Sequence, residues 1–221
     1  MQKGDFRRAV QVLRHATEYM KDSIDTPEVE QQRWTLPMTP GHLLQYVVPV
    51  ATLPLRLTQD EGGLFDVFQC AFRAPFIPGD EWEIINQSRA SVTNLYNMAL
   101  AHHQQGLSRG YDSSRNLKLA RNLYKMALSV VETIQPDLSS DHFMLLLTLA
   151  VFNNMGQISA SWYDEAETKK CIRAVTSLTD SHTVHAAMQS EASDIFSFFR
   201  LGGVVYRLIT GSSCFAIAPQ A

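Results

Sequence analysis

Two histidines three positions apart, His182 and His185, have the spacing most suggestive of metal chemistry, with Glu191 further along. Residues three apart lie on one face of a helix, and paired imidazoles of this kind occur in metal-ligand sets. Only two residues of the set are close together, however, and isolated histidine pairs are usually surface residues. We therefore predict that the chain has no metal site.

Other reactive side chains lack the partners that catalysis requires. His102 and His103 are consecutive, so on a helix they point in different directions and cannot act together. Cys70, Cys171 and Cys214 have no obvious basic activator in the sequence, such as a paired histidine. The sequence contains neither a Gly-rich phosphate loop nor a G-x-S-x-G elbow. We predict no enzymatic activity, no cofactor and no small-molecule substrate.

A third set of side chains suits the binding of a peptide. Tyr96, Leu100 and His103 form a stripe on a predicted helix over residues 80–103, flanked by Asn97 and Gln104. Amides can bond to backbone groups, and an aromatic side chain can anchor a partner. The comparable residues of a later helix complete the predicted partner-binding set: Asn153, Asn154 and Gln157.

This interpretation has an alternative of equal weight. Tyr96 and Leu100 would then be core side chains, buried against the segment 50–72. The partner-binding interpretation instead places both on the concave side of a stack of helices, where an extended peptide or a partner helix would bind.

The helix that follows this set has two apolar stripes. One contains small residues, Ala120 and Ala127, which let two helix backbones approach closely, as Ala99 does on the preceding helix. The second stripe lies beside the first: Leu119, Leu123, Met126 and Val130. Two stripes predict a helix that is covered on two sides, as in stacked helical hairpins or in a bundle.

Three segments carry a family resemblance: NLYNMALAH at 94–102, NLYKMA at 122–127 and NNMGQI at 153–158. Together they resemble divergent tetratricopeptide-repeat (TPR-like) proteins, of a class common in unicellular algae such as diatoms. The resemblance implies an α-solenoid of antiparallel helix pairs that offers a surface to another protein. The chain departs from the pattern at Lys170, where an aromatic is expected, and in a long turn over residues 106–114. The Lys and Arg residues with which chaperone-tail-binding TPR proteins hold their ligands are absent, so that activity is not expected.

The remaining chain is predicted to contain further helices, a polar linker at 23–38 and a Pro-rich insert at residues 37–79, which contains six of the nine prolines. Within the insert, residues 50–58 and 64–72 are short and apolar and predict a β-hairpin around a Gly-containing loop. Pro54 would confine the first strand to an edge. Further helices are predicted at 4–21, 143–159, 163–178 and 181–199, with a tail at 202–221 that the sequence leaves open.

Composition narrows the functional class. The 221 residues carry a formal net charge of -3, which gives no basic excess for nucleic acid or an anionic membrane. The three scattered cysteines favour a reducing compartment, and the start of the chain has no apolar signal core. We expect a single mainly α-helical domain over residues 1–221, located in the cytoplasm.

The function favoured by the sequence is a protein-interaction scaffold or adaptor, whose partner the sequence does not name. The alternative is an all-helical small-ligand-binding or catalytic domain with a pocket near the Pro-rich insert. Polar residues spread along helix faces favour the scaffold.

Overall fold

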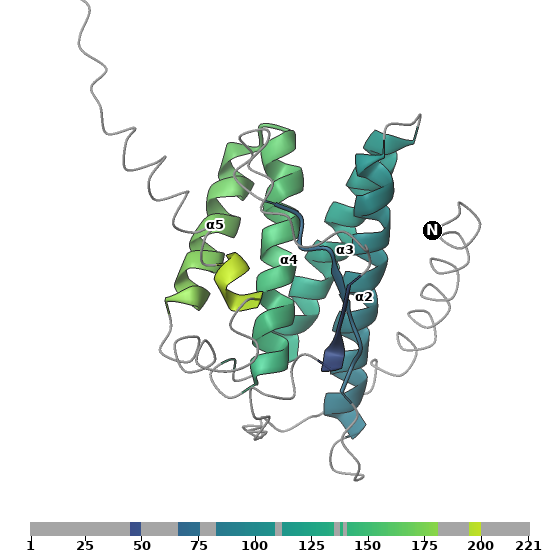
Figure 1. Cartoon of the computed structure of the whole chain (residues 1–221), viewed down its shortest axis with the longest axis vertical. Coiled ribbons are helices and arrows are strands. Elements are labelled where there is room, and N and C mark those ends of the chain that lie inside the picture. The colour runs from purple at the N-terminus through teal and green to yellow at the C-terminus, as the bar shows by residue number, and fades with distance from the viewer. Residues whose placement is uncertain are drawn as a thin grey trace, which may run out of the picture.

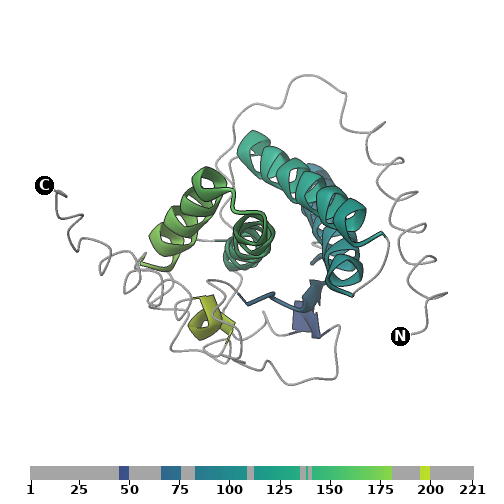
Figure 2. The same ribbon diagram turned by 90° about the horizontal axis from the view of Figure 1, so that it is seen from above.

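The computed structural model describes residues 45–49, 66–75, 83–108, 112–134, 138, 141–180 and 195–199. This part of the chain is mostly helical, as predicted. The long helices are α2 (Glu83–Leu107), α3 (Ser113–Ile134), α4 (His142–Ser161) and α5 (Glu165–Thr179). They lie side by side, with α4 in the middle, α5 on one side and α2 with α3 on the other (Figure 1, Figure 2).

Helices α2 and α3 form an antiparallel pair, since Gly106 lies beside Leu117 and His103 lies beside Tyr124. The small residues expected at helix contacts, Ala99, Ala120 and Ala127, are all fully buried. Their burial confirms that these alanines belong to the core, where the two backbones pack closely.

The second apolar stripe of α3 is less covered than predicted. Met126 is 50% exposed and Leu119 is 38% exposed, whereas Leu123 and Val130 are half-buried. The prediction of two covered sides is therefore wrong for Leu119 and Met126. The packing of α2 and α4 on α3 buries the alanine-containing stripe, and these two side chains project away from it.

The turn between α2 and α3 is shorter than the predicted 106–114. Gly106 lies in the last turn of α2, and Ser113 is the first residue of α3. A Cβ at Gly106 would lie 2.6 Å from Leu117 Cγ, so glycine allows α2 to continue beside α3 for one more turn. The predicted end of this helix at His103 is accordingly four residues too early.

Helix α4 is the core of the array. Asp141 caps its N-terminus, with its side chain accepting a hydrogen bond from the backbone N–H of Met144 at 3.0 Å. The helix has the length and apolar composition to cross a membrane, but 83% of its most apolar window is buried inside the protein. Burial among the other elements accounts for its apolar character.

The strand pairing differs in part from the predicted hairpin. β1 (Val47–Pro49) pairs antiparallel with β2 (Cys70–Phe72), and Val47 lies opposite Phe72. The second strand falls within the predicted 64–72. Its partner, β1, lies just before the predicted 50–58, and the whole of that range, Pro54 included, lies outside the described residues.

Residues 66–75, which we call the strap, cross the array on the side where the short helix 195–199 also lies (Figure 2). That short helix lies at the end of the helix predicted over 181–199, and in it Ile195, Phe196 and Phe199 are buried while Phe198 is half-buried. The predicted helix 4–21, the tail 202–221, His182, His185, Glu191 and Cys214 lie outside the described residues.

Candidate functional site

Two asparagine side chains hold the backbone of the strap. The Asn154 carboxamide accepts a hydrogen bond from Phe68 N–H at 2.8 Å and donates one to the Phe68 carbonyl at 3.1 Å. Asn97 does the same to Phe72, accepting from its N–H at 2.9 Å and donating to its carbonyl at 2.8 Å. Each carboxamide thus satisfies both polar backbone groups of a single residue of an extended chain.

The two asparagines come from the two helices that the strap crosses, Asn97 from α2 and Asn154 from α4. Asparagine is a weak helix former, because its side chain competes for backbone hydrogen bonds. Here both carboxamides bond to a different segment, so their energetic role is to hold the strap. A neighbouring asparagine extends the contact, since Asn153 Nδ2 donates to the Asp66 carbonyl at 2.7 Å.

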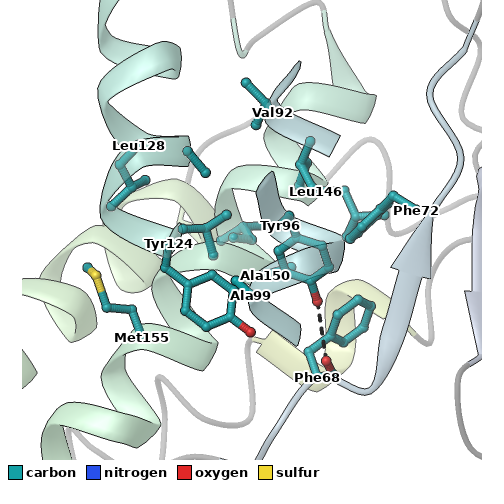
Figure 3. Close-up of a cluster of buried hydrophobic side chains, with 14 of the residues drawn as sticks. Phe68, Phe72, Val92, Tyr96, Ala99, Tyr124, Leu128, Leu146, Ala150 and Met155 are labelled. Carbon is teal, nitrogen blue, oxygen red and sulfur yellow. Dashed lines mark hydrogen bonds between the residues drawn. The ribbon is translucent and has the colours of Figure 1, made fainter. Parts of the chain in front are cut away.

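Tyr96 makes a third contact with the strap. It lies between the two asparagines, each of which clamps the backbone of one strap residue. Its buried hydroxyl donates to the carbonyls of Cys70 at 3.1 Å and Phe68 at 3.3 Å, the second of which is drawn in Figure 3. Burial, with a smaller contribution from Tyr124, raises the pKa of Tyr96 well above its ordinary value. The phenol therefore stays protonated and remains a donor to the strap.

A second polar layer lies behind Asn154. Asn154 Nδ2 lies 3.2 Å from the Tyr124 hydroxyl, which in turn lies 3.4 Å from His103 Nδ1. His103 Nε2 bonds Gln157 Oε1 at 2.8 Å. Burial lowers the pKa of His103 to about 4, although the bond to Gln157 opposes this shift. A neutral ring that carries its proton on Nε2 can donate to Gln157 Oε1 and can accept a hydrogen bond from the Tyr124 hydroxyl on Nδ1.

Aromatic rings surround the two clamped residues of the strap. The Phe68 ring lies 4.9 Å from Phe199 and 5.5 Å from Phe198, both on the short helix 195–199. The Phe72 ring meets Tyr96 of α2 edge-on at 5.1 Å and Phe143 of α4 at 5.9 Å. Both phenylalanines are buried, and Figure 3 shows Phe68 and Phe72 turned toward the helices. Edge-to-face geometry at these separations stabilises aromatic pairs beyond the effect of burial alone.

The structure places the eight predicted partner-binding residues in two layers. Most of them are buried, and the prediction of an open concave surface is wrong for these: Tyr96, Leu100, His103, Asn153 and Asn154. The remaining three are half-buried: Asn97, Gln104 and Gln157. The alternative interpretation, in which Tyr96 packs against the insert, is correct. The physical reason is that the strap itself covers this face.

Sequence reasoning anticipated the amides and the tyrosine but missed what they hold. Phe68, Cys70 and Phe72 alternate with partly buried neighbours along the strap, which is the period-2 pattern of a half-buried strand. The sequence shows this alternation only weakly, because Val67 and Ala71 are apolar as well and Gln69 alone is polar among the residues between. Tyr124 is not among the predicted site residues, yet its hydroxyl joins the amide network.

The histidine and cysteine side chains within the described residues fit structural roles. His102 Nδ1 lies 3.0 Å from Asn116 Oδ1 between α2 and α3. Burial raises the pKa of the Cys70 thiol to about 11 and that of Cys171 to about 12, so neither is a thiolate at neutral pH. Among the residues that the structure describes, no group of three His, Cys, Asp or Glu side chains is placed to hold a metal ion.

Comparison with protein-family models, with curated proteins and with solved structures gives no match for this chain. The candidate site is therefore defined by geometry alone: the strap and the four residues that hold its backbone. We call these four residues, Tyr96, Asn97, Asn153 and Asn154, the amide face.

Proposed function

We propose that this protein is an intracellular interaction scaffold whose helical array binds an extended peptide segment of another protein through the amide face. The observation that carries the proposal is the pair of carboxamide clamps, Asn97 on Phe72 and Asn154 on Phe68. A surface that bonds N–H and C=O groups in pairs recognises extended backbone whatever its side chains. The strap supports this binding mode, because its own extended backbone is held in this way within one chain.

The proposal includes a TPR-like arrangement of the helices. Its support is that α2 packs on α3, with Ala99, Ala120 and Ala127 buried, and that α4 packs on α5, as consecutive helices do in such repeats. It also includes a cytoplasmic location and the absence of enzymatic turnover. The polar groups of the amide face bond to backbone and to one another, which supports a binding role for this face rather than a catalytic one.

A buried Tyr124–His103 pair is the observation nearest to the catalytic alternative. The pair is 3.4 Å apart and belongs to a network that ends on Gln157. Both side chains are fully buried, and the hydrogen bonds of the ring and the hydroxyl go to other side chains of the network. We therefore assign the pair to support of Asn154 rather than to chemistry on a substrate.

The test uses the full-length protein with the strap weakened by Phe72→Ala, which removes one aromatic anchor and leaves the backbone of the strap intact. A fluorescein-labelled peptide with the sequence of residues 66–75, DVFQCAFRAP, is titrated under reducing conditions and followed by anisotropy. We expect saturable binding. Adding Asn154→Ala should weaken it at least ten-fold, since a two-bond clamp is lost.

The matched control is Asn122→Ala, an exposed asparagine of α3 that should leave peptide affinity unchanged. Circular dichroism establishes that each variant remains helical. Where the Asn154 variant loses helicity, the less buried Asn97→Ala takes its place. A folded Phe72→Ala variant that binds no peptide, or binding that is insensitive to both asparagines, would contradict the proposed function.

A further inference from the structure

The strap is held against α2 and α4 by the kind of side-chain contacts that bind a separate peptide, although it belongs to the same chain. Its contacts to α2 and α4 include hydrogen bonds from helix side chains to strap backbone, made at Asp66, Phe68, Cys70 and Phe72. In an ordinary sheet the backbone groups would bond to backbone on a neighbouring strand. Here only three residues, Cys70–Phe72, pair with a strand, and that strand is itself only three residues long.

We infer that the strap is a displaceable intramolecular competitor, and that its sequence reports the motif of the partner: an extended segment with aromatic residues at positions one and five and a small residue at position three. This inference rests on the proposed function. It adds which peptides the amide face selects and how the chain regulates their access.

The register of the motif follows from the two clamps. Asn154 and Asn97 hold residues 68 and 72, four positions apart, and in an extended chain residues separated by an even number lie on the same face. The side chains at positions one, three and five therefore all turn toward the helices. Phe68, Cys70 and Phe72 are 0%, 4% and 4% exposed, as this register requires.

Specificity must come from side chains, because the clamps contact only backbone. Position one is surrounded by Phe198 and Phe199, and position five by Tyr96 and Phe143, so each accepts an aromatic ring. Position three holds the nearly fully buried Cys70, whose carbonyl is bonded by the Tyr96 hydroxyl. A long side chain there would overpack the contact.

Competition follows from the occupancy of the same groups. While the strap is bound, the donors and acceptors of Asn97 and Asn154 are engaged and the aromatic surroundings are filled. A partner segment binds only the fraction of molecules in which the strap has detached, so its apparent affinity is reduced by that fraction. Weakening the strap should therefore raise the affinity for a partner without any change in the amide face.

The experiment compares wild-type protein with the Phe72→Ala variant against a panel of labelled peptides based on residues 66–75. We expect the unaltered peptide to bind the variant at least ten-fold more tightly than wild type. Peptides with Ala in place of either phenylalanine should lose at least ten-fold in affinity for the variant. A peptide with Ala in place of Gln69, which alternates to the other face, should change by less than about three-fold.

The outcomes separate this inference from the proposed function. If no peptide binds the folded variant, the proposed function fails and this inference fails with it. If peptides bind but wild type and variant have equal affinities, or the aromatic positions have no effect, the amide face still binds peptide and only the inference is overturned. A second strap variant, Phe68→Ala, must give the same ranking for the inference to stand.

Discussion

Asn154 on α4 has more polar partners than any other side chain described above. Asn154 bonds the N–H and C=O of Phe68 and lies within 3.3 Å of the hydroxyls of Tyr96 and Tyr124, while being fully buried. A carboxamide has two donors and one acceptor oxygen, so its capacity is fully used. Residues of this kind are costly to remove, because their partners remain buried without hydrogen bonds.

Replacing this residue gives the first prediction. Asn154→Ala should lower the free energy of unfolding by about 2–4 kcal/mol, since the backbone groups of Phe68 lose their partner in a buried site. Urea denaturation measures the loss. Asn122→Ala, on the exposed side of α3, should change stability by less than about 0.5 kcal/mol. Equal midpoints for the two variants would show that the clamp does not stabilise the fold.

The buried histidine gives a pH-dependent prediction. Burial lowers the pKa of His103 from 6.5 to about 4, so between these values the unfolded chain binds more protons than the folded chain. Stability should therefore be complete above pH 6.5 and should fall as pH drops toward 4, by about 3 kcal/mol in total for this group. Urea denaturation from pH 7.5 to 5 should show a flatter pH dependence for His103→Gln. Parallel curves for the two proteins would contradict a buried neutral ring.

The turn between α4 and α5 contains a residue in an unfavourable conformation. Tyr163 has a φ of 57° and a side chain that is 94% exposed, so it has strain without compensating burial. Tyr163→Gly should leave stability unchanged or raise it by up to about 1 kcal/mol in thermal denaturation. Ala166→Gly, three residues later in the first turn of α5, should instead lower it by about 1 kcal/mol. A loss of stability in both variants would show that Tyr163 has a stabilising contact.

At the scale of elements, a buried ion pair links the first turns of α2 to the N-terminus of α4. Arg89 pairs with Asp141, which also caps α4, and both side chains are less than a tenth exposed. Arg89 Nε and Nη1 are buried without a hydrogen-bond partner in the structure, so the guanidinium is only partly satisfied. Such a pair is expensive to break and contributes little beyond what an apolar replacement would give.

A double-mutant comparison tests this pair. Arg89→Met alone should lower the free energy of unfolding by about 3–5 kcal/mol, because a carboxylate is left buried without its counter-charge. Combining it with Asp141→Ser removes that charge while retaining a capping side chain, and should restore at least half of the loss in urea denaturation. A double variant no more stable than the single one would indicate that the pair itself stabilises the helix junction.

The helices were accessible to sequence reasoning because their signals are local. The buried stripe of α3, the Asp141 cap of α4 and the Asp164 cap of α5 all follow from neighbouring residues. The extension of α2 to Leu107 was missed, because it depends on Gly106 fitting against Leu117 of the next helix. The same distinction explains why α3 was predicted to be covered on both sides. The exposure of Met126 is set by where other elements pack.

At the scale of the whole molecule, the hydrogen-bonding side chains of the amide face were predictable, and the segment that they bond was not. Amides able to bond backbone groups, with Tyr96 as an anchor, could be identified from helical spacing alone. That this backbone belongs to the strap depends on contacts such as Phe68 to Asn154, which are separated by 86 residues in the chain. No local pattern specifies such a pairing, so an exposed peptide-binding surface and a buried core remained equally weighted expectations.

The same contacts admit two descriptions of the strap. As a permanent core strand, it would open only when the whole protein unfolds. As a displaceable ligand, it would detach while α2 and α4 remain folded. The two descriptions differ in the free energy of local opening, which amide hydrogen exchange reports residue by residue.

The most direct measurement is native-state hydrogen exchange of the Phe68 and Phe72 amides, which Asn154 and Asn97 protect. The reference is the set of amides at Leu146, Leu149 and Ala150, in the fully buried part of α4. We predict that the strap amides exchange through an opening at least about 2 kcal/mol less costly than that of the α4 amides, with little dependence on urea. Equal opening free energies and equal urea dependence for both sets would show that the strap is an integral core strand.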